Sequence, residues 1–371
     1  MKKRIEILTL VSCLFWAGGA LVQAADWPVC RGDALATATV KAELPAELDV
    51  LWKHTLPESG YEGTAVIAGG IVYVGDVDGT FYAYKLSDGT EVWQQKFEDS
   101  GFLAGAAFHE NRLYVGDFNG VIRAIDAKDG KELWQYTAKG EAYAAPNVVD
   151  GRVLVTTEAG ELVSLAANSG ELQWQFQIEA PLRCWPTVVG GRVLLAGCDE
   201  RVHAVDVTSG EEVAGVDIDG PTGATPAMLN GSALFGTEQG SFYAIDSKTM
   251  EIVWRHLDPG YTNAIHTAAA VNSRVAVYGT QGKQFFALKP ATGEVAWTFP
   301  VRSHVESSPV IAGDSVFLAT KRGMIHRVDV DTGKELWSYE AGGDFQASFA
   351  ISDGKLVIGN TDGTLYCFGA K

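Results

Sequence analysis

The segment at residues 73–80, YVGDVDGT, carries the residue types of an acidic metal loop. Asp76 and Asp78 alternate along it, and a glycine follows at the place where a calcium-binding loop turns sharply. Two such carboxylates could hold a cation or carry out acid–base chemistry. The equivalent segment FLATKRGM argues against both, because Lys321 and Arg322 occupy its loop. We therefore predict that the two aspartates form a hairpin turn in which the glycine adopts a positive φ angle.

The rest of the sequence contains none of the common catalytic or metal-binding motifs. It has no His-Glu-x-x-His, no Gly-x-Ser-x-Gly, no phosphate-binding loop and no Cys-x-x-Cys-His. The seven histidines are scattered without the spacing of metal ligands, and His203 and His326 occupy strand positions that carry tyrosine in other units. We therefore predict no metal site and no catalytic residue.

An internal repeat of about 40 residues organises the chain. The sequence AIDAKDGKELW at residues 124–134 recurs in forms such as ALKPATGEVAW and RVDVDTGKELW. Each unit alternates short β-branched or aromatic runs with glycine-containing turns, the pattern of four antiparallel strands. Eight units predict an all-β fold, an eight-bladed β-propeller of four-stranded antiparallel blades. The tryptophans in this phase are Trp52, Trp93, Trp134, Trp174, Trp254, Trp297 and Trp337, and Ala214 stands where the eighth would be.

The two ends of the repeat region predict how the ring closes. The last unit ends in LYCFGAK after three strands, and LDVLWKHTL at residues 48–56 is a tryptophan strand without the three strands that precede it. We expect the N-terminal strand to complete the last blade, so that residues 48–371 form the propeller. Residues 25–47, which include DWPVCRG, are left outside the repeat as an N-terminal segment.

The first 24 residues have the features of a secretory signal peptide. Lys2, Lys3 and Arg4 precede a largely apolar run, and Ala24 supplies the small residue that cleavage needs. We therefore expect a mature chain in the periplasm or outside the cell. A lipobox-like sequence ending in Cys13 is the alternative, which would make the protein a lipoprotein. No other segment is long and apolar enough to span a membrane.

Charge and cysteine content limit the function further. The net charge of −17 excludes a nucleic-acid partner, since phosphate contacts require clustered Lys and Arg. Cys184 and Cys198 lie almost symmetrically about the turn at residues 190–191, so a disulfide between them is possible. A bridge between Cys30 and Cys367, and four unpaired buried cysteines, are the alternatives.

The repeated pattern Ala-x-Asp-x-x-Thr-Gly-x-x-x-Trp resembles the tryptophan-docking repeat of the pyrroloquinoline quinone-like (PQQ-like) propellers, and similar motifs cover almost all of residues 48–371. The resemblance implies that each tryptophan packs between neighbouring blades. Some members are quinoprotein dehydrogenases that bind PQQ and calcium in the central channel. Others, such as BamB, are non-enzymatic scaffolds of outer-membrane protein assembly. The adjacent cysteines typical of the alcohol-oxidising enzymes are absent from this sequence.

The candidate binding site is the mouth of the central channel, where the repeat varies most. The varied positions just before the small residues of each innermost strand are Glu62, Leu103, Tyr143, Arg183, Gly223, Ile265, Glu306 and Gln346. Two further departures lie nearby, namely LRCWP and the longer loop HLDPGYTNAIHT. From these observations we predict a shared pocket or protein-docking surface formed by Glu62, Arg183, Trp185, Tyr261, His266, Glu306 and Gln346.

The sequence favours a non-enzymatic role. A rigid, monomeric propeller that presents loops to a protein or a cell-envelope polymer fits the minimal blades and the varied mouth. The main alternative is an oxidoreductase that uses PQQ and calcium as cofactors at the channel mouth. A third option is a carbohydrate-binding propeller that uses Trp185 and Tyr261.

Overall fold

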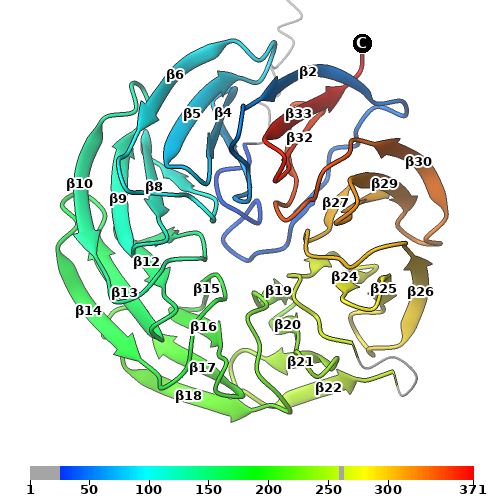
Figure 1. Ribbon diagram of the computed structural model, residues 1–371. Helices are drawn as coiled ribbons and strands as arrows, with labels where there is room; N and C mark the ends of the chain where they lie inside the picture. Colours follow the sequence, from blue (N-terminus) through cyan, green and yellow to red (C-terminus); the bar gives the residue numbers. More distant parts are fainter. Residues whose placement is uncertain (1–25, 259–262) are drawn as a thin grey trace, which may run out of the picture.

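The computed structural model describes residues 26–258 and 263–371, and all regular elements in these ranges are β-strands. Eight sheets stand around a central axis like the blades of a propeller, and the four main strands of each are antiparallel (Figure 1). This confirms the predicted eight-bladed, all-β fold. Within the described ranges, no helix is long and apolar enough to cross a membrane.

The blades are numbered here in chain order. Blades 1 to 4 comprise β3 (Val66–Ala68), β4 (Ile71–Gly75), β5 (Thr80–Lys85) and β6 (Glu91–Lys96); β7 (Ala107–His109), β8 (Arg112–Gly116), β9 (Val121–Asp126) and β10 (Glu132–Thr137); β11 (Asn147–Val149), β12 (Arg152–Thr156), β13 (Glu161–Ala166) and β14 (Leu172–Gln177); and β15 (Thr187–Val189), β16 (Arg192–Ala196), β17 (Arg201–Asp206) and β18 (Glu212–Asp217).

Blades 5 to 8 comprise β19 (Ala227–Leu229), β20 (Ser232–Gly236), β21 (Phe242–Asp246) and β22 (Ile252–His256); β23 (Ala270–Val271), β24 (Ala276–Thr280), β25 (Gln284–Leu288) and β26 (Val295–Pro300); β27 (Val310–Ala312), β28 (Ser315–Ala319), β29 (Met324–Asp329) and β30 (Glu335–Glu340); and β31 (Ala350–Ser352), β32 (Lys355–Gly359), β33 (Thr364–Gly369) and β2 (Asp49–Thr55). The short β1 (Thr39–Val40) adds to blade 7.

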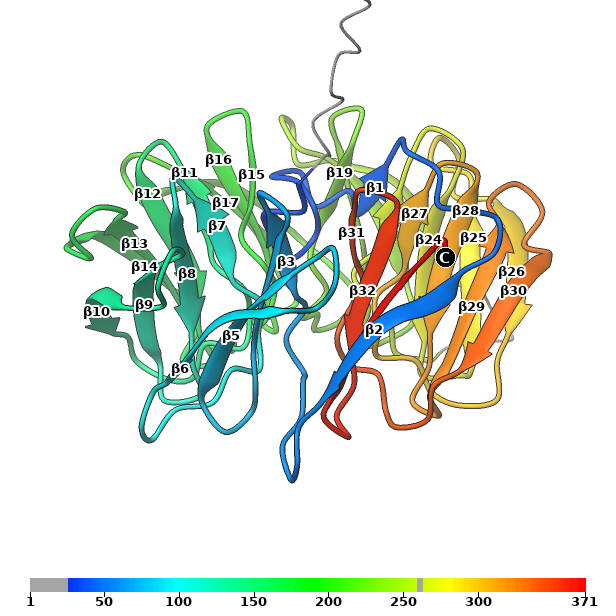
Figure 2. The ribbon, with the colours of Figure 1, turned by 90° about the horizontal axis from the view of Figure 1, so that it is seen from above.

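The ring closes as predicted, with strands from the two ends of the described chain in one blade. The sheet order of blade 8 is β2-β33-β32-β31, and β2 pairs antiparallel with β33. Figure 2 shows this outermost N-terminal strand crossing in front of the last strands of the chain. This pairing ties both ends of the described chain into one sheet, which protects them from fraying.

Each blade is sandwiched between two others, and this explains the burial of its middle strands. β13 buries five of its six residues, whereas the outer strand β14 alternates between exposed and half-buried positions. Strands covered on both faces are apolar along their length, while an outer strand has only one covered face. The repeated sequence therefore encodes a middle pair of buried strands and an amphipathic outer strand in each unit.

Asp76 turns the chain, as the comparison between repeat units predicted. Its buried carboxylate accepts hydrogen bonds from the backbone N–H groups of Asp78 and Thr80, at 3.1 and 2.7 Å, and from the Tyr82 hydroxyl at 2.9 Å. Gly79 follows with a φ of 89°, a left-handed conformation that favours glycine. The carboxylate is therefore occupied in holding the β4–β5 hairpin.

The repeated tryptophans lie between neighbouring blades. The Trp134 indole donates a hydrogen bond to the carbonyl of Ala167 in blade 3 at 3.0 Å, and its ring lies against Gly170 of the same turn. A side chain at that glycine would meet the indole, so the contact requires glycine as well as tryptophan. The same tryptophan–glycine contact is made by Trp52 with Gly89, Trp93 with Gly130, Trp174 with Gly210, Trp254 with Gly293, and Trp297 with Gly333.

Of the alternatives left open for the cysteines, the structure has the unpaired one, and the possible disulfide between Cys184 and Cys198 is not formed. The four cysteines of the described ranges are all free. Cys184 is buried in the apolar core between blades 3 and 4, whereas the Cys198 sulfur lies 3.8 Å from the carbonyl oxygen of Thr222. The two side chains therefore contact different neighbours, although they flank the same β15–β16 hairpin.

Candidate functional site: the channel mouth

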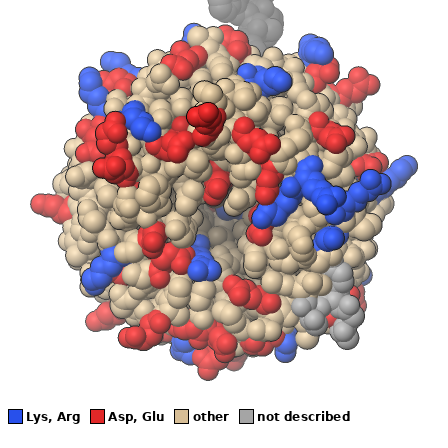
Figure 3. All heavy atoms as spheres, in the orientation of Figure 1, with Lys and Arg blue, Asp and Glu red and all other residues tan. Residues whose placement is uncertain are grey.

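One position in each blade forms a ring around the open end of the channel. The ring consists of Glu62, Leu103, Tyr143, Arg183, Gly223, His266, Glu306 and Gln346, each one residue after a buried residue that packs against the neighbouring blade. Figure 3 shows this face hollowed at its centre and rimmed by charges of both signs. We call these eight residues the mouth ring.

The mouth ring corrects one assignment from the sequence. Ile265 is 1% exposed and packs in the core between blades 5 and 6, so it does not face the channel. His266 holds the ring position instead. The extra residues in the loop before it shift the repeat by one, and the backbone N–H of Ile265 makes the bond to Thr237 that marks the buried position in this blade.

Blades 6 and 7 contribute a hydrogen-bonded network to the mouth. His266 Nδ1 lies 3.3 Å from the Glu306 carboxylate. The side-chain amide of Gln281 donates to the same carboxylate at 2.7 Å. The hydrogen bond to Glu306 raises the pKa of His266. Burial alone would raise the pKa of Glu306, but the hydrogen bond and charge of His266 outweigh it and hold that pKa below the usual value.

Blade 8 extends the network toward blade 1. Lys321 lies between two carboxylates, 4.0 Å from Glu306 and 3.8 Å from Asp344. Partial burial, followed by the charge of Asp344, raises the pKa of Glu62. Burial also raises the pKa of Asp344, whose Oδ1 is buried without a hydrogen-bond partner. This sector therefore has more acid than the single lysine neutralises.

On the opposite side of the mouth, Arg183 forms a bidentate ion pair with Glu158. The two guanidinium–carboxylate distances are 2.8 and 3.0 Å, the paired geometry that makes such contacts strong. Half of the Arg183 side chain remains exposed, and the exposed Tyr143 neighbours it in the mouth ring. This sector presents a cation and a phenol, so the mouth has chemically different sides.

The N-terminal segment closes the other end of the channel. Trp27 is fully buried and forms a β-bridge with Ile67 of blade 1. The chain then crosses the axis to blade 7, where β1 runs parallel to β27. Figure 1 shows this dark-blue segment inside the ring, and Figure 2 shows it near the face opposite the mouth. Residues 26–47, expected to lie outside the propeller, are thus its plug.

Arg31 anchors the plug to three blades. Its guanidinium donates to the carbonyl oxygens of Ala269 and Pro309, at 2.9 and 3.1 Å, and to the Ser348 hydroxyl at 3.2 Å. Arg31 is 2% exposed, and burial lowers its pKa to about 10. Backbone carbonyls compensate this buried cation in place of a carboxylate.

Trp185 does not line the mouth, contrary to the sequence-based prediction. It is 2% exposed, and its indole donates to the Pro146 carbonyl at 2.9 Å. The ring packs with Val29 and Ala36 of the plug, so it forms part of the channel floor. The plug buries the Trp185 ring, and nothing in the sequence around LRCWP indicates that this ring is buried.

The remaining predicted residues are distributed as follows. Glu62, Arg183, His266, Glu306 and Gln346 all lie in the mouth ring, and only His266 and Glu306 contact each other directly among the described pairs. Gln346 is exposed. Tyr261 lies outside the described residues.

Comparison with known proteins identifies the family of propellers to which the chain belongs. A family model described as outer membrane protein assembly factor BamB matches residues 36–102, 87–183 and 243–371, which is more than half of the chain. The chain belongs to this BamB family. The BamB of Burkholderia pseudomallei is 35% identical over 63 residues, which cover 17% of this chain and 16% of that protein. The match therefore spans about a sixth of that relative's length.

Two solved structures share the fold. BamB from Moraxella catarrhalis has a TM-score of 0.77 and 17% identity, covering 87% of this chain and 100% of that one. A quinohemoprotein alcohol dehydrogenase from Comamonas testosteroni has a TM-score of 0.76 and 16% identity, covering 94% of this chain and 81% of that one. At these identities both matches describe architecture alone.

The mouth offers little to a PQQ–calcium pair. PQQ carries three carboxylates, but the cations nearest the channel, Arg183 and Lys321, are already paired with acids. Over residues 26–258 and 263–371, no three His, Cys, Asp or Glu side chains are placed to hold a metal ion. Arg31 is already bonded in the floor. The residues that are described do not fit this cofactor pair.

Proposed function

We propose that this BamB-family propeller is a periplasmic scaffold that binds a protein partner in outer-membrane protein assembly. The observation that carries the proposal is the mouth ring. A rigid eight-fold repeat presents eight different or differently paired side chains at one open face, while the plug blocks the opposite end. A cup closed at one end suits docking of a partner's surface better than passage of a substrate through the channel.

The charge distribution supports a polar docking surface. Arg183 with Glu158, and Glu306 with His266 and Lys321, lie on different sides of the mouth. Charges around the rim of an interface set orientation and association rate more than affinity. A partner with a complementary pattern of charges would therefore bind in one orientation, with its acidic groups near Arg183 and its basic groups near Glu306.

The test uses the chain from Ala25 onward, immobilised and exposed to the envelope fraction of its own cells, with captured proteins identified by mass spectrometry. We expect wild-type protein to enrich components of the outer-membrane assembly machinery, and the R183A/E306A variant to lose them. The matched control is D129A/K131A, which also removes one acid and one base, from an exposed ion pair on a blade turn. Circular dichroism verifies the fold of each variant.

Two results would contradict the scaffold. One is equal capture by the wild type and R183A/E306A. The other is a PQQ-dependent chromophore with dye reduction after PQQ and calcium are added, since that outcome supports the oxidoreductase alternative.

A further inference from the structure

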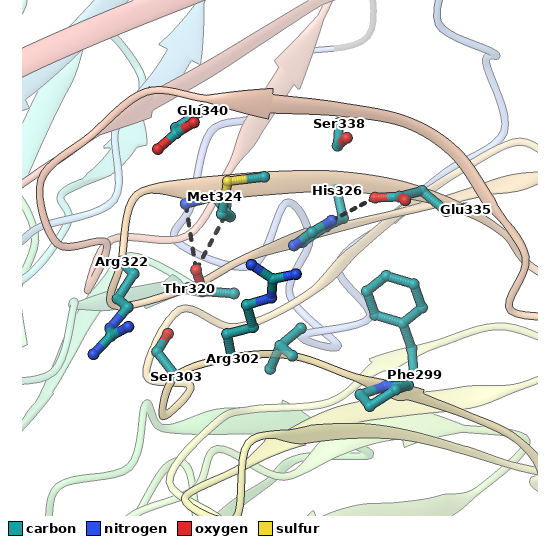
Figure 4. Close-up of a pocket in the computed structure, with 12 residues that line it drawn as sticks. Phe299, Arg302, Ser303, Thr320, Arg322, Met324, His326, Glu335, Ser338 and Glu340 are labelled. Carbon is teal, nitrogen blue, oxygen red and sulfur yellow. Dashed lines mark hydrogen bonds and ion pairs between the residues drawn. The ribbon is translucent and has the colours of Figure 1, made fainter.

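A second concave site lies away from the channel, between the outer parts of blades 6 and 7. It has a volume of about 680 Å³ and is bounded by the end of β26 and the loop after it on one side, and by β30 on the other. Met324 and His326 of β29 line it between these walls (Figure 4). We call it the inter-blade groove. None of its residues belongs to the mouth ring.

The inter-blade groove carries two arginines without a described partner, although the protein as a whole is strongly acidic. Arg302 and Arg322 are both exposed, and neither has a hydrogen bond or ion pair with any other described residue. Figure 4 shows the Arg302 side chain extending into the groove toward His326. Of the two carboxylates in the lining, Glu335 is bonded to His326 at 2.7 Å, and Glu340 stands on the wall opposite Arg302. Two arginines are thus left for an anionic ligand.

The cations around the groove continue to the mouth. Figure 3 shows Lys and Arg side chains gathered in one sector of the mouth face, to the right of the channel. Lys321, next to Arg322 in the chain, pairs with Glu306 of the mouth ring. A partner that docks at the mouth could therefore reach the groove with a neighbouring segment.

The shape of the groove points to an extended peptide. Its lining follows β30 from Glu335 to Glu340, and six residues of strand span roughly 20 Å, longer than a simple inorganic anion requires. Phe299, Val301 and Met324 give it apolar surface between the charges. Both β26 and β30 are the last strands of their sheets, so each has one edge without a strand partner. A bound peptide in an extended conformation points every second side chain to the same face, so these side chains could contact the groove.

We propose that the inter-blade groove binds an extended acidic segment of the partner protein, with its carboxylates on Arg302 and Arg322 and its apolar side chains against Phe299 and Met324. This inference rests on the proposed scaffold function, because it assigns a second contact to the same partner. Arginine suits the role, since its planar guanidinium can hold a carboxylate through two hydrogen bonds.

The experiment measures fluorescence anisotropy of a labelled six-residue peptide in which aspartate alternates with valine and phenylalanine. The protein is the chain from Ala25 onward. We expect saturable binding that weakens as salt increases. The R302E/R322E variant should bind at least about tenfold more weakly, since two charge-assisted contacts are reversed. The charge-matched control K128E/K248E, on exposed turns of blades 2 and 5, should bind like the wild type.

Three outcomes would overturn the groove assignment. They are equal binding by R302E/R322E, equal binding of a peptide with asparagine in place of aspartate, and R302E/R322E-sensitive binding to phosphatidylglycerol vesicles without any binding of the peptide. The two proposals fail separately. Loss of envelope capture in R183A/E306A with no peptide binding leaves the scaffold and removes the groove. Peptide binding without R183A/E306A-sensitive capture leaves the groove and removes the mouth scaffold.

Discussion

Six blade contacts pair a tryptophan with a glycine, whereas the contact between blades 4 and 5 pairs the small Ala214 with the large Met250. Ala214 in β18 stands at the tryptophan position of blade 4, and Met250 stands at the glycine position of the turn that faces it from blade 5. Met250 is 4% exposed and has a φ of 57°, like the glycines it replaces. A large residue has moved from one side of the interface to the other, and the contact stays filled.

Without the indole, the facing turn of blade 5 still accepts hydrogen bonds from an arginine of blade 4. Arg192 of blade 4 donates to the carbonyl oxygens of Ser247 and Lys248, at 3.3 and 2.9 Å. Ser247 corresponds to Ala167, which accepts from both the Trp134 indole and Arg112. The blade 4–blade 5 interface therefore keeps the arginine bond, lacks the indole bond and fills the apolar contact with Met250.

We predict that M250G destabilises the protein by about 1–3 kcal/mol. The loss of a buried methionine, about 2–5 kcal/mol for comparable deletions, outweighs the relief of left-handed backbone strain. A214W alone should also destabilise, because its indole meets Met250. The A214W/M250G variant should be more stable than the sum of the two effects by at least about 1 kcal/mol. Urea denaturation measures all four proteins, and simple additivity would show that the two positions are independent.

The tryptophan contacts permit a matched comparison between Trp134 and Trp337. The Trp134 indole has a hydrogen bond to the next blade, whereas the described contacts of Trp337 are with the rings of Tyr339 and Phe368. Blade 8 offers no equivalent turn, because β33 and β2 come from distant parts of the sequence.

W134F should therefore cost about 1 kcal/mol more than W337F, which is the net value of a typical hydrogen bond. Both substitutions remove similar aromatic area from half-buried positions. Thermal unfolding of the two variants measures the difference. Equal losses would mean that ring packing alone, and not the indole hydrogen bond, holds blades 2 and 3 together.

The repeat made the propeller predictable from the sequence, whereas the segment that closes the channel was not predictable. Trp and Gly recur in most units because six blade contacts use the same geometry, so spacing alone indicates blade number, closure and turns. The plug has no such period. Arg31 bonds to Ser348, 317 residues away, and a single crossing leaves no pattern in the sequence.

The same limit explains the two errors at the candidate site. Trp185 looks like an exposed departure from the repeat, but the segment that buries it lies about 150 residues earlier. The sequence-based alignment of the repeats assigned Ile265 to the mouth ring because it misplaced the extra residues of the preceding loop by one position. The ring positions in regular blades, such as Glu62 and Arg183, were predictable because their units keep the common length.

We predict that R31A destabilises the protein by about 3 kcal/mol, because it leaves the Ala269 and Pro309 carbonyls buried without their donor. Proteolysis near the N-terminus should become faster at the same time. The control is R302A, which removes an exposed arginine that has no described partner. Equal stability of the two variants would show that the plug is held by its apolar contacts.

The His266–Glu306 pair should give a pH-dependent signal at the mouth. The His266 pKa is raised, so its contribution to stability is complete below its unfolded value of 6.5 and is lost as the pH rises through the folded pKa. The Glu306 pKa is lowered, so its contribution is present above 4.5 and is lost as the pH falls through the folded pKa. The pair is therefore best formed between these two values.

NMR titration of the imidazole resonances measures this effect. We expect the His266 midpoint to lie above the usual histidine value in the wild type and to fall in E306Q, which removes the charge of its partner. His256 is the internal control, since burial lowers its pKa and E306Q should leave it unchanged. A His266 midpoint that does not move in E306Q would show that the two side chains do not interact in solution.

The cysteines provide a test of the corrected disulfide. Burial raises the pKa of Cys184 and of Cys367 to about 12, so each thiol has very little reactive thiolate at neutral pH. Burial also raises the pKa of Cys198, but this side chain is only half-buried and is more accessible to a reagent. In the folded chain from Ala25 onward, N-ethylmaleimide should therefore modify Cys198 before Cys184 and Cys367.

After unfolding without a reductant, four thiols should react, because all four cysteines are free. Two reactive thiols would instead restore the bridge between Cys184 and Cys198, or one of its alternatives, and peptide mapping of the linked pair would identify which.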